Sequence, residues 1–553
     1  MMEPNRSRPT PMPAEELGAL GSTQGLMRAG AMVQGFPKGD ILLLETPFFS
    51  QTGSEEVRAY VQSKYNLALL ALGSYLRSHS EMSVFLINMV KDRISEDSLI
   101  QRLRVSPPKV VGIPLYSYNL GLSYQIISRL KAEFPSLHVC VGGPHVGMFP
   151  DETIQLPHVD SIVLGDGEEP FLQISRQVLK RGCIDEENLP PGTTTKASHA
   201  AGHKALRWQA PDLDALPMPD LRLLGDHSRY RDFLSNRRMA ILTTSRGCPF
   251  ACHYCSSESS KYRSFSIGRI IDIMKYYQEH GVEYVEFWDE TFNPNKRRLE
   301  EFADALTASK LRMPWGIRGA VVLHTPVETL RKLHRTGLRI MQFGVETAQP
   351  RLADYLNKRI DPQVIRDAFA SCRAAGIRTV ANLMVNIPGE TKHEMLADLQ
   401  FLEEIKATYV SVSVYNWAPG TTHYTDALKR GMLQRDHWRE FATNPVGEEP
   451  IVHATTEVPI DEVYSTRDRF ICRHYFNPSF VARYLRMVEP REALRAASIG
   501  RIMLTGQVRE ASRKLACRVF GRRTKISGRT LTPPLMGGMP EDSQLVSTTA
   551  LAG

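Results

Sequence analysis

Short apolar runs alternate with amphipathic stretches of helix length along most of the chain, and this alternation constrains the fold more than any other feature. The first apolar runs are at residues 41–45, 84–88, 110–114, 139–142 and 161–164. The helix-type stretches between them are at residues 65–77, 120–134 and 170–180. Short apolar runs flanked by helices are typical of buried parallel strands. The sequence therefore predicts an α/β domain at residues 39–182, with a doubly wound parallel sheet.

A second series of βα patterns follows a Pro- and Asp-rich stretch, residues 183–236, that we interpret as a linker. Its apolar runs are at residues 239–243, 284–288, 315–317, 340–345, 378–385 and 410–415. Six βα units predict a partial TIM-like (βα)6 barrel over residues 237–425. Residues 426–520 have helical patterns, which predict a mostly helical C-terminal region. Residues 1–38 and 521–553 lack periodicity and are expected to be disordered tails.

Composition excludes several classes of protein. No apolar run of the 553 residues approaches the roughly 20 needed for a membrane-spanning helix, and no secretory signal is visible. Eight cysteines in so long a chain do not suggest a disulfide framework, so a reducing, cytoplasmic setting is expected. The net charge is +8, but basic and acidic residues are mixed, so nucleic-acid binding is not expected. Basic residues gather at 509–525, as a solvated helix or as a contact for an anionic substrate or membrane surface.

Three cysteines directly after the first strand of the second series carry the clearest chemical signal. Cys248, Cys252 and Cys255 have the spacing C-x3-C-x2-C. Three thiolates from one loop suit an iron–sulfur cubane whose fourth iron stays open for a non-protein ligand. The alternative is a structural zinc site, which needs four protein ligands. The chain has no second C-x2-C pair, and His253 would have to supply the fourth ligand.

With Tyr254 before the last cysteine, this loop resembles the signature of the radical S-adenosylmethionine (SAM) superfamily. The resemblance implies a 4Fe-4S cluster at Cys248, Cys252 and Cys255 that binds and cleaves SAM. Glu346 in the run FGVET resembles the family element whose carboxylate holds SAM, and the run NIPGET at 386–391 resembles another element with Asn386 in place of glycine. Asp289 and Arg318 fall where similar proteins have SAM-facing residues. A structural ion pair is the alternative for both.

Two glycine-rich loops follow strands of the first domain. One contains Gly142, Gly143, Pro144 and His145, and the other contains Gly165, Gly167 and Glu168. Glycine allows close approach of the backbone to a large flat ligand. With the cysteine motif, these loops resemble the cobalamin-binding radical SAM enzymes, which include methyltransferases and the anaerobic Mg-protoporphyrin ester cyclase. The resemblance implies cobalamin at these loops. The chain has no D-x-H-x-x-G motif, so His145 is not expected to ligate cobalt, and a domain that has lost the cofactor is the alternative.

These resemblances imply a cobalamin-dependent methyltransferase that acts on an unactivated carbon of a small secondary-metabolite or lipid-like substrate. An external electron donor such as flavodoxin or ferredoxin would reduce the cluster. The alternatives are a cyclisation, rearrangement or oxygenation with the same cofactors, and a cobalamin-binding regulatory or carrier protein with a structural cluster. A methylthiotransferase is not expected, because the first domain lacks a second cysteine trio. By position alone, the candidates for substrate contact are Tyr415, Asn416, Trp417 and the turn Pro419–Gly420–Thr421.

Overall fold

The computed structural model describes residues 39–47, 64–258, 260–358, 360–447 and 449–497. The described residues belong to one compact unit that begins at Gly39. The predicted tails and the basic stretch at 509–525 lie outside the described residues.

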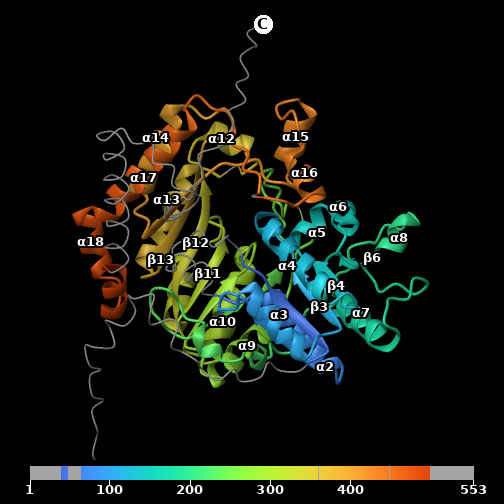
Figure 1. The fold of residues 1–553 in the computed structure, drawn as a ribbon. Coiled ribbons are helices and arrows are strands. Elements are labelled where there is room, and N and C mark those ends of the chain that lie inside the picture. The colour runs from blue at the N-terminus through green and yellow to red at the C-terminus, as the bar shows by residue number, and fades with distance from the viewer. Residues whose placement is uncertain (1–38, 48–63, 259, 359, 448, 498–553) are drawn as a thin grey trace, which may run out of the picture. The chain divides into compact units, whose positions relative to one another are not determined.

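The first domain is a six-stranded sheet with the order β2-β1-β3-β4-β5-β6 (Figure 1). Its strands are β1 (Ile41–Glu45), β2 (Val84–Asn88), β3 (Val110–Pro114), β4 (His138–Gly142), β5 (Ser161–Val163) and β6 (Thr193–Thr195). The first five strands are parallel and β6 is antiparallel. The doubly wound sheet is therefore confirmed. The strand order reverses between β1 and β3, and ligands bind beyond the carboxyl ends of the strands at such a switch point.

Helices cover both faces of this sheet. They are α2 (Leu67–His79), α3 (Glu96–Val105), α4 (Leu120–Glu133), α5 (Pro144–Met148), α6 (Pro150–Gln155) and α7 (Glu168–Arg181). Side-chain caps fix where two of them begin, since Asn66 accepts from the amide of Leu69 and Ser95 from that of Ser98. Helix α7 ends at Gly182, which has a left-handed φ of +81°.

The stretch predicted as a linker contains ordered structure. It carries β6, α8 (Lys196–Ala200) and the 3-10 helices η4 (Leu221–Leu224) and η5 (His227–Arg229). The β-branched run of β6 pairs with β5 and extends the sheet. Trp208 also forms a bridge with Gly165. Much of this stretch therefore packs as part of the first domain.

The second sheet has the order β14-β13-β12-β11-β10-β7, and all its pairings are parallel. Its strands are β7 (Met239–Leu242), β10 (Tyr284–Trp288), β11 (Trp315–Ala320), β12 (Leu338–Glu346), β13 (Arg378–Val385) and β14 (Tyr409–Val414). The helices that follow the strands are α9 (Ile267–Glu279), α10 (Lys296–Ala308), α11 (Val327–Thr336), α12 (Pro350–Tyr355), α13 (Pro362–Ala374) and α14 (Lys392–Glu404). The partial barrel is thus confirmed.

The C-terminal region is helical, as predicted. It contains α15 (Thr422–Lys429), α16 (His437–Thr443), α17 (Ile460–Phe476) and α18 (Pro478–Leu485). Glu492 pairs with Arg378 at the start of β13, and Glu489 pairs with Arg237 just before β7. These ion pairs tie the last described residues to the amino ends of strands near both edges of the sheet. None of the described helices is long and apolar enough to cross a membrane.

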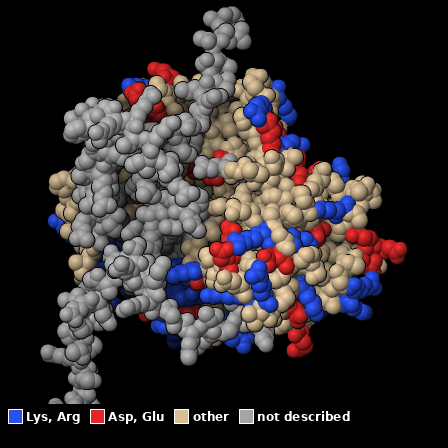
Figure 2. All heavy atoms as spheres, in the orientation of Figure 1, with Lys and Arg blue, Asp and Glu red and all other residues tan. Residues whose placement is uncertain are grey.

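Charged side chains of both signs are mixed on the visible surface. Figure 2 shows Lys and Arg lying among Asp and Glu over the first domain, without one large patch of either sign. The described surface of this face therefore offers no continuous basic track.

An aromatic cluster supports the outer side of the barrel strands. Phe287, Phe292, Phe302 and Trp315 have ring centroids 5.2–6.4 Å apart. These residues come from β10, its following loop, α10 and β11. Burial of such rings and their edge-to-face contacts both stabilise the packing of helix on sheet.

We expect Phe302→Ala to lower the free energy of unfolding by about 3–5 kcal/mol, because the change leaves a cavity among three aromatic rings. Denaturant-induced unfolding followed by fluorescence measures the loss. The matched control is Leu396→Ala on α14, whose side chain is 46% exposed. It should change stability by no more than about 0.5 kcal/mol. Equal effects of the two substitutions would contradict the assigned core.

Candidate functional site

The three cysteines lie on one loop that follows β7. Two short strands, β8 (Ser245–Arg246) and β9 (Arg263–Ser264), pair antiparallel and close its base. Gly247 opens the loop at φ +86°, and a Cβ there would lie 2.3 Å from the carbonyl oxygen of Lys261. Only glycine fits this position. The backbone at Gly247 and the backbone at Lys261 are therefore held close together at the base of the loop.

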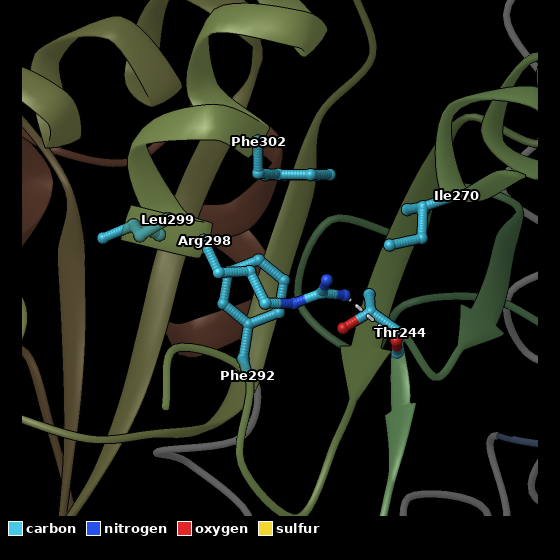
Figure 3. Close-up of a pocket in the computed structure, with 6 residues that line it drawn as sticks. All are labelled: Thr244, Ile270, Phe292, Arg298, Leu299 and Phe302. Carbon is cyan, nitrogen blue, oxygen red and sulfur yellow. Dashed lines mark hydrogen bonds between the residues drawn. The ribbon is translucent and has the colours of Figure 1, made fainter. Parts of the chain in front are cut away.

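Buried groups anchor the base of the loop. Arg298 of α10 donates to the carbonyl oxygen of Thr244 at 3.3 Å, as Figure 3 shows, and to that of Phe265 at 3.2 Å. The cavity in this view has room for about one water molecule, so it is not a substrate site.

Asp289 binds the start of the loop. Its Oδ1 accepts from the amide and hydroxyl of Thr244, both at 2.8 Å, and from the hydroxyl of Ser245 at 2.7 Å. Burial raises the pKa of Asp289 to about 6. Its Oδ2 is buried and has no hydrogen-bond partner among the described residues. The contacts of Asp289 thus position the cysteine loop, whereas the sequence predicted a contact with SAM.

The three thiols influence one another electrostatically. Burial raises the pKa of Cys252 and of Cys255, neighbouring thiols raise it further, and Lys358 lowers it. The hydroxyl of Thr291 lies 3.0 Å from Cys248 Sγ. Among the described residues, no three His, Cys, Asp or Glu side chains are placed to hold a single metal ion. Three half-buried thiols on one loop fit a cluster in which three irons would each be bound by a different thiolate and the fourth would stay open.

Glu346 ends β12 in a strained conformation, with φ +64°. Its Oε1 lies 3.0 Å from Nζ of Lys358, which in turn lies 3.4 Å from the hydroxyl of Tyr254. A Cβ at Gly344 would lie 2.6 Å from that Nζ, so glycine leaves room for the ion pair. The structure thus places Glu346 and Tyr254 together beside the cysteines. Lys358 was missed, because nothing in its local sequence points to this pair.

Asn386 stands where the resembling element has glycine, and it has φ +64°. Asparagine tolerates this conformation better than most residues. Its amide donates to Glu390, and its side-chain amide donates to the carbonyl oxygen of Ala454 at 3.0 Å. The turn is therefore formed without the glycine.

Arg318 lies in an ion-pair network. Its Nε is 2.9 Å from Glu286, and Nη1 donates to Gln342 at 2.8 Å. Lys64 of the first domain lies 2.5 Å from the other oxygen of Glu286. Burial would raise the pKa of Glu286, but the two cations lower it to about 2. The ion-pair alternative therefore describes Arg318 in this structure.

The first glycine-rich loop lies at the end of β4. Gly143 has φ +94°, and a Cβ there would lie 3.0 Å from the carbonyl oxygen of Leu115. A local backbone requirement thus explains this glycine. Gly142 differs, since its φ is not positive and its Cβ would meet nothing closer than 3.6 Å. Gly142 is therefore the position where a side chain tests ligand approach alone. Pro144 is exposed and begins α5.

His145 is fully buried. Its Nδ1 lies 2.9 Å from the hydroxyl of Ser117, and its Nε2 has no hydrogen-bond partner among the described residues. Burial lowers the pKa of His145 to about 4, so the ring is neutral at pH 7. Its contacts support the loop.

The second glycine-rich loop meets the arms of the cysteine loop. Glu168 lies 2.6 Å from Arg246 of β8, and Asp166 lies 2.7 Å from Arg263 of β9 and 3.1 Å from Arg246. Gly165 has φ +93°, and a Cβ there would lie 2.1 Å from the carbonyl oxygen of Trp208, whereas a Cβ at Gly167 would touch Leu72. The observed partners of this loop are therefore protein groups, although the sequence predicted cofactor contacts.

Two tyrosines at the switch point were not predicted as site residues. Tyr116 and Tyr118 follow β3 and stack with ring centroids 5.2 Å apart. Asn66 donates to the hydroxyl of Tyr116 at 3.0 Å. Tyr118 is 42% exposed and offers a flat apolar face. The sequence signal that could have indicated this part of the site is the pair of tyrosines directly after a buried strand.

The side chains proposed for substrate contact directly follow β14. Tyr415 and Trp417 are both buried in this structure, and their contact with a substrate stays a prediction. Asn416 accepts from the amide of Val452 at 3.1 Å. Both aromatic side chains pack in a core formed by distant segments, which their position after a strand does not indicate.

Two protein-family models match the chain. The model of the Radical SAM superfamily matches residues 242–402, and the model of the B12 binding domain matches residues 58–175. The first match includes the cysteine loop and Glu346, and the second includes the switch point and the loop at Gly142.

Three relatives illustrate the range of similar proteins. An uncharacterized methyltransferase of Pyrococcus horikoshii is 27% identical over 398 residues, which are 71% of this chain and 84% of that protein. The anaerobic magnesium-protoporphyrin IX monomethyl ester cyclase of Rubrivivax gelatinosus is 26% identical over 329 residues, 58% of each chain. The hopanoid C-3 methylase of Methylococcus capsulatus is 25% identical over 67% of this chain and 69% of that protein.

Two solved structures have a similar fold. The radical SAM methyltransferase TsrM of Kitasatospora setae, with cobalamin and a [4Fe-4S] cluster bound, has a TM-score of 0.60 at 14% identity. The match covers 82% of this chain and 91% of TsrM. The enzyme OxsB, with aqua-cobalamin and SAM bound, has a TM-score of 0.59 at 16% identity and covers 88% of this chain and 76% of OxsB.

We expect Glu346→Gln to weaken SAM binding by about 1–3 kcal/mol, because the amide keeps the size of the side chain but loses its charge. Calorimetric titration of cluster-loaded protein with SAM measures the effect, and iron content should stay unchanged. Glu404→Gln is the control, because Glu404 is an exposed carboxylate at the end of α14 that pairs with Arg366. If Glu346→Gln leaves the affinity for SAM unchanged, Glu346 does not bind SAM and its ion pair with Lys358 is structural.

We expect Gly142→Val to reduce cobalamin uptake strongly, since a branched side chain would stand between the strand end and a flat ligand. Gly142→Ala should have a smaller effect. The corrinoid absorption spectrum after reconstitution measures uptake, with iron content as the internal reference. Gly143→Val is unsuitable as a test because it strains the backbone itself. Full corrinoid uptake by Gly142→Val would place the ligand elsewhere.

Proposed function

We propose that the chain is a radical SAM enzyme with a B12-binding domain, and that it methylates an unactivated carbon of a small molecule. One observation carries this proposal. The loops at the carboxyl ends of the two sheets meet, because Arg246 and Arg263 beside the cysteines pair with Asp166 and Glu168 of the first domain. Reactive groups held at both strand ends would therefore face a shared space, as transfer between them requires.

Residues of both domains fit the three cofactors. Cys248, Cys252 and Cys255 would hold the 4Fe-4S cluster, and Glu346 with Lys358 would hold the charged part of SAM. The face of Tyr118 and the backbone at Gly142 would border cobalamin. When bound, the cluster and SAM would supply the abstraction of a hydrogen atom from carbon, and cobalamin would supply a methyl group.

The protein's own contribution is charge balance and placement. Lys358 stabilises thiolate over thiol at Cys252 and Cys255, which favours metal binding by these side chains. Its ammonium group also pairs with Glu346, so the two side chains offer one cationic and one anionic group to the charged part of SAM. Asp289 fixes the start of the loop, which keeps the three thiols at one spacing.

The relatives favour methyl transfer over the alternatives. The Pyrococcus protein named as a methyltransferase aligns over 84% of its length, whereas the Rubrivivax cyclase aligns over 58%. A cytidylyl-2-hydroxyethylphosphonate methyltransferase of Streptomyces wedmorensis also aligns, with 70% of its length covered. The Rubrivivax and Streptomyces proteins are named for two different small molecules, which supports a small-molecule substrate without specifying which one.

We further propose a cytoplasmic location and an external electron donor such as flavodoxin or ferredoxin. The seven cysteines among the described residues are all free thiols, which suits a reducing compartment. The cluster would have to be reduced by one electron, which an external protein donor would supply.

We expect Cys252→Ala to abolish formation of 5′-deoxyadenosine from SAM under reducing conditions, because the cluster loses one of its three ligands. Cys372→Ala is the control, since Cys372 is buried in α13 away from the loop. Anaerobic assay with dithionite and chromatography measures the product. Near-normal 5′-deoxyadenosine in Cys252→Ala would contradict the cluster assignment.

The mass of the product distinguishes methylation from its alternatives. With the substrate supplied, methyl transfer adds one CH2, whereas cyclisation or rearrangement does not. A carrier protein with a structural cluster would bind corrinoid yet form no 5′-deoxyadenosine. Either of these results would contradict the proposed function.

A further inference from the structure

A second hydrophobic core lies apart from the main one and joins distant segments. It consists of buried apolar residues of the first domain, the barrel loops and the C-terminal helices: Phe149, Leu352, Leu356, Ile387, Tyr415, Trp417, Tyr424, Ala427, Trp438, Ala442 and Ala454. Tyr254 of the cysteine motif and Met148 pack against it. No residue of this second core has a role in the cofactor sites described above.

His423, at the start of α15, is the polar centre of this region and is buried. Its Nε2 lies 3.0 Å from the carbonyl oxygen of Tyr355, which can only accept. Nε2 therefore carries the proton, and Nδ1 accepts from the hydroxyl of Tyr415 at 2.9 Å. The ring also stacks on Tyr355 at 4.3 Å. Both ring nitrogens and one face are thus engaged.

The same residue holds the cysteine loop from outside. The amide of His423 donates to the carbonyl oxygen of His253, between two of the cysteines, at 3.0 Å. The hydroxyl of Thr422 donates to Glu258 at 2.5 Å, three residues after Cys255. On the other side, the side chain of Asn357 donates to the carbonyl oxygen of Ala251 at 2.5 Å. Hydrogen bonds from the start of α15 and from the turn after α12 therefore hold the cysteine loop on two sides.

The second core continues to the first domain. Trp438 donates to the carbonyl oxygen of Trp417 at 2.8 Å, and Arg439 of the same helix pairs with Glu152 of α6 at 3.3 Å. Phe149, between α5 and α6, lies in the same core. One continuous packing unit thus links the helix after the Gly142 loop with the helix that holds the cysteine loop (Figure 1).

We infer that His423 is a positioning residue, which holds the cysteine loop in register with the first domain through the second core. It touches neither the thiols nor a cofactor, so it acts through the backbone of His253 and the ring of Tyr355. This inference rests on the radical SAM part of the proposed function and not on methyl transfer.

The test compares two histidines in cluster-loaded full-length enzyme. His423→Phe keeps the stacked ring but removes both ring hydrogen bonds. We expect iron loss to a chelator to become about tenfold faster, and kcat for SAM cleavage to fall about tenfold with KM within twofold. The electron paramagnetic resonance spectrum of the reduced cluster with SAM should broaden. His423→Gln, which can restore the donor to Tyr355, should recover most of each effect.

His453→Phe is the matched control. His453 also bridges Tyr415 and a second tyrosine, Tyr464, but it makes no contact with the cysteine loop in the described structure. It should leave iron loss, kcat and the spectrum as in the wild type. Should His423→Phe fail to fold, Tyr415→Phe removes only one hydroxyl and should speed iron loss about twofold.

Two results would overturn the inference. One is wild-type iron loss and spectrum in His423→Phe, or in Tyr415→Phe if that variant is needed. The other is an equal change in His453→Phe. These measurements require no substrate and no cobalamin. They therefore test the role of His423 even if no methylated product is found. Absence of any cluster in the wild type would instead refute the proposed function.

Discussion

The joint between the two sheets depends on four charged side chains. Arg246 and Arg263 flank the cysteine loop, and they pair with Asp166 and Glu168 at the end of the first sheet. Burial would raise the pKa of Asp166, yet the two arginines lower it. These pairs are partly buried, and such pairs add little net stability but are costly to break, because the remaining charge has no partner. The joint therefore fixes how the loops of the two sheets meet.

Much of the fold could be predicted from the sequence because the signal is local. The predicted strands at residues 41–45, 84–88, 110–114 and 378–385 match the observed bounds. Helix α3 was not predicted, since its buried Leu99, Ile100 and Leu103 stand among charged residues. Strand β6 was hidden because three threonines have no apolar run. Its strand character comes from pairing with β5.

The candidate site was predictable only where one segment carries the chemistry. The three cysteines share one loop, so their spacing was sufficient. Lys358 comes to Glu346 through the turn after α12, and no local pattern shows that contact. Likewise, the ion pair between Glu168 and Arg246 joins two distant segments, and the sequence around Glu168 does not indicate it. Side chains whose role depends on a distant partner cannot be assigned from their own neighbourhood.

Strand β6 and Trp208 have a consequence for the history of such chains. Both follow residue 182, yet they complete the first sheet and pack on its second glycine loop. A segment ending at 182 would leave β5 as an uncovered edge, which proteins avoid because it invites aggregation. Recombination at that point would produce two damaged parts. The evolutionary unit that contains the first domain therefore extends past Trp208, into the stretch whose sequence resembles a linker.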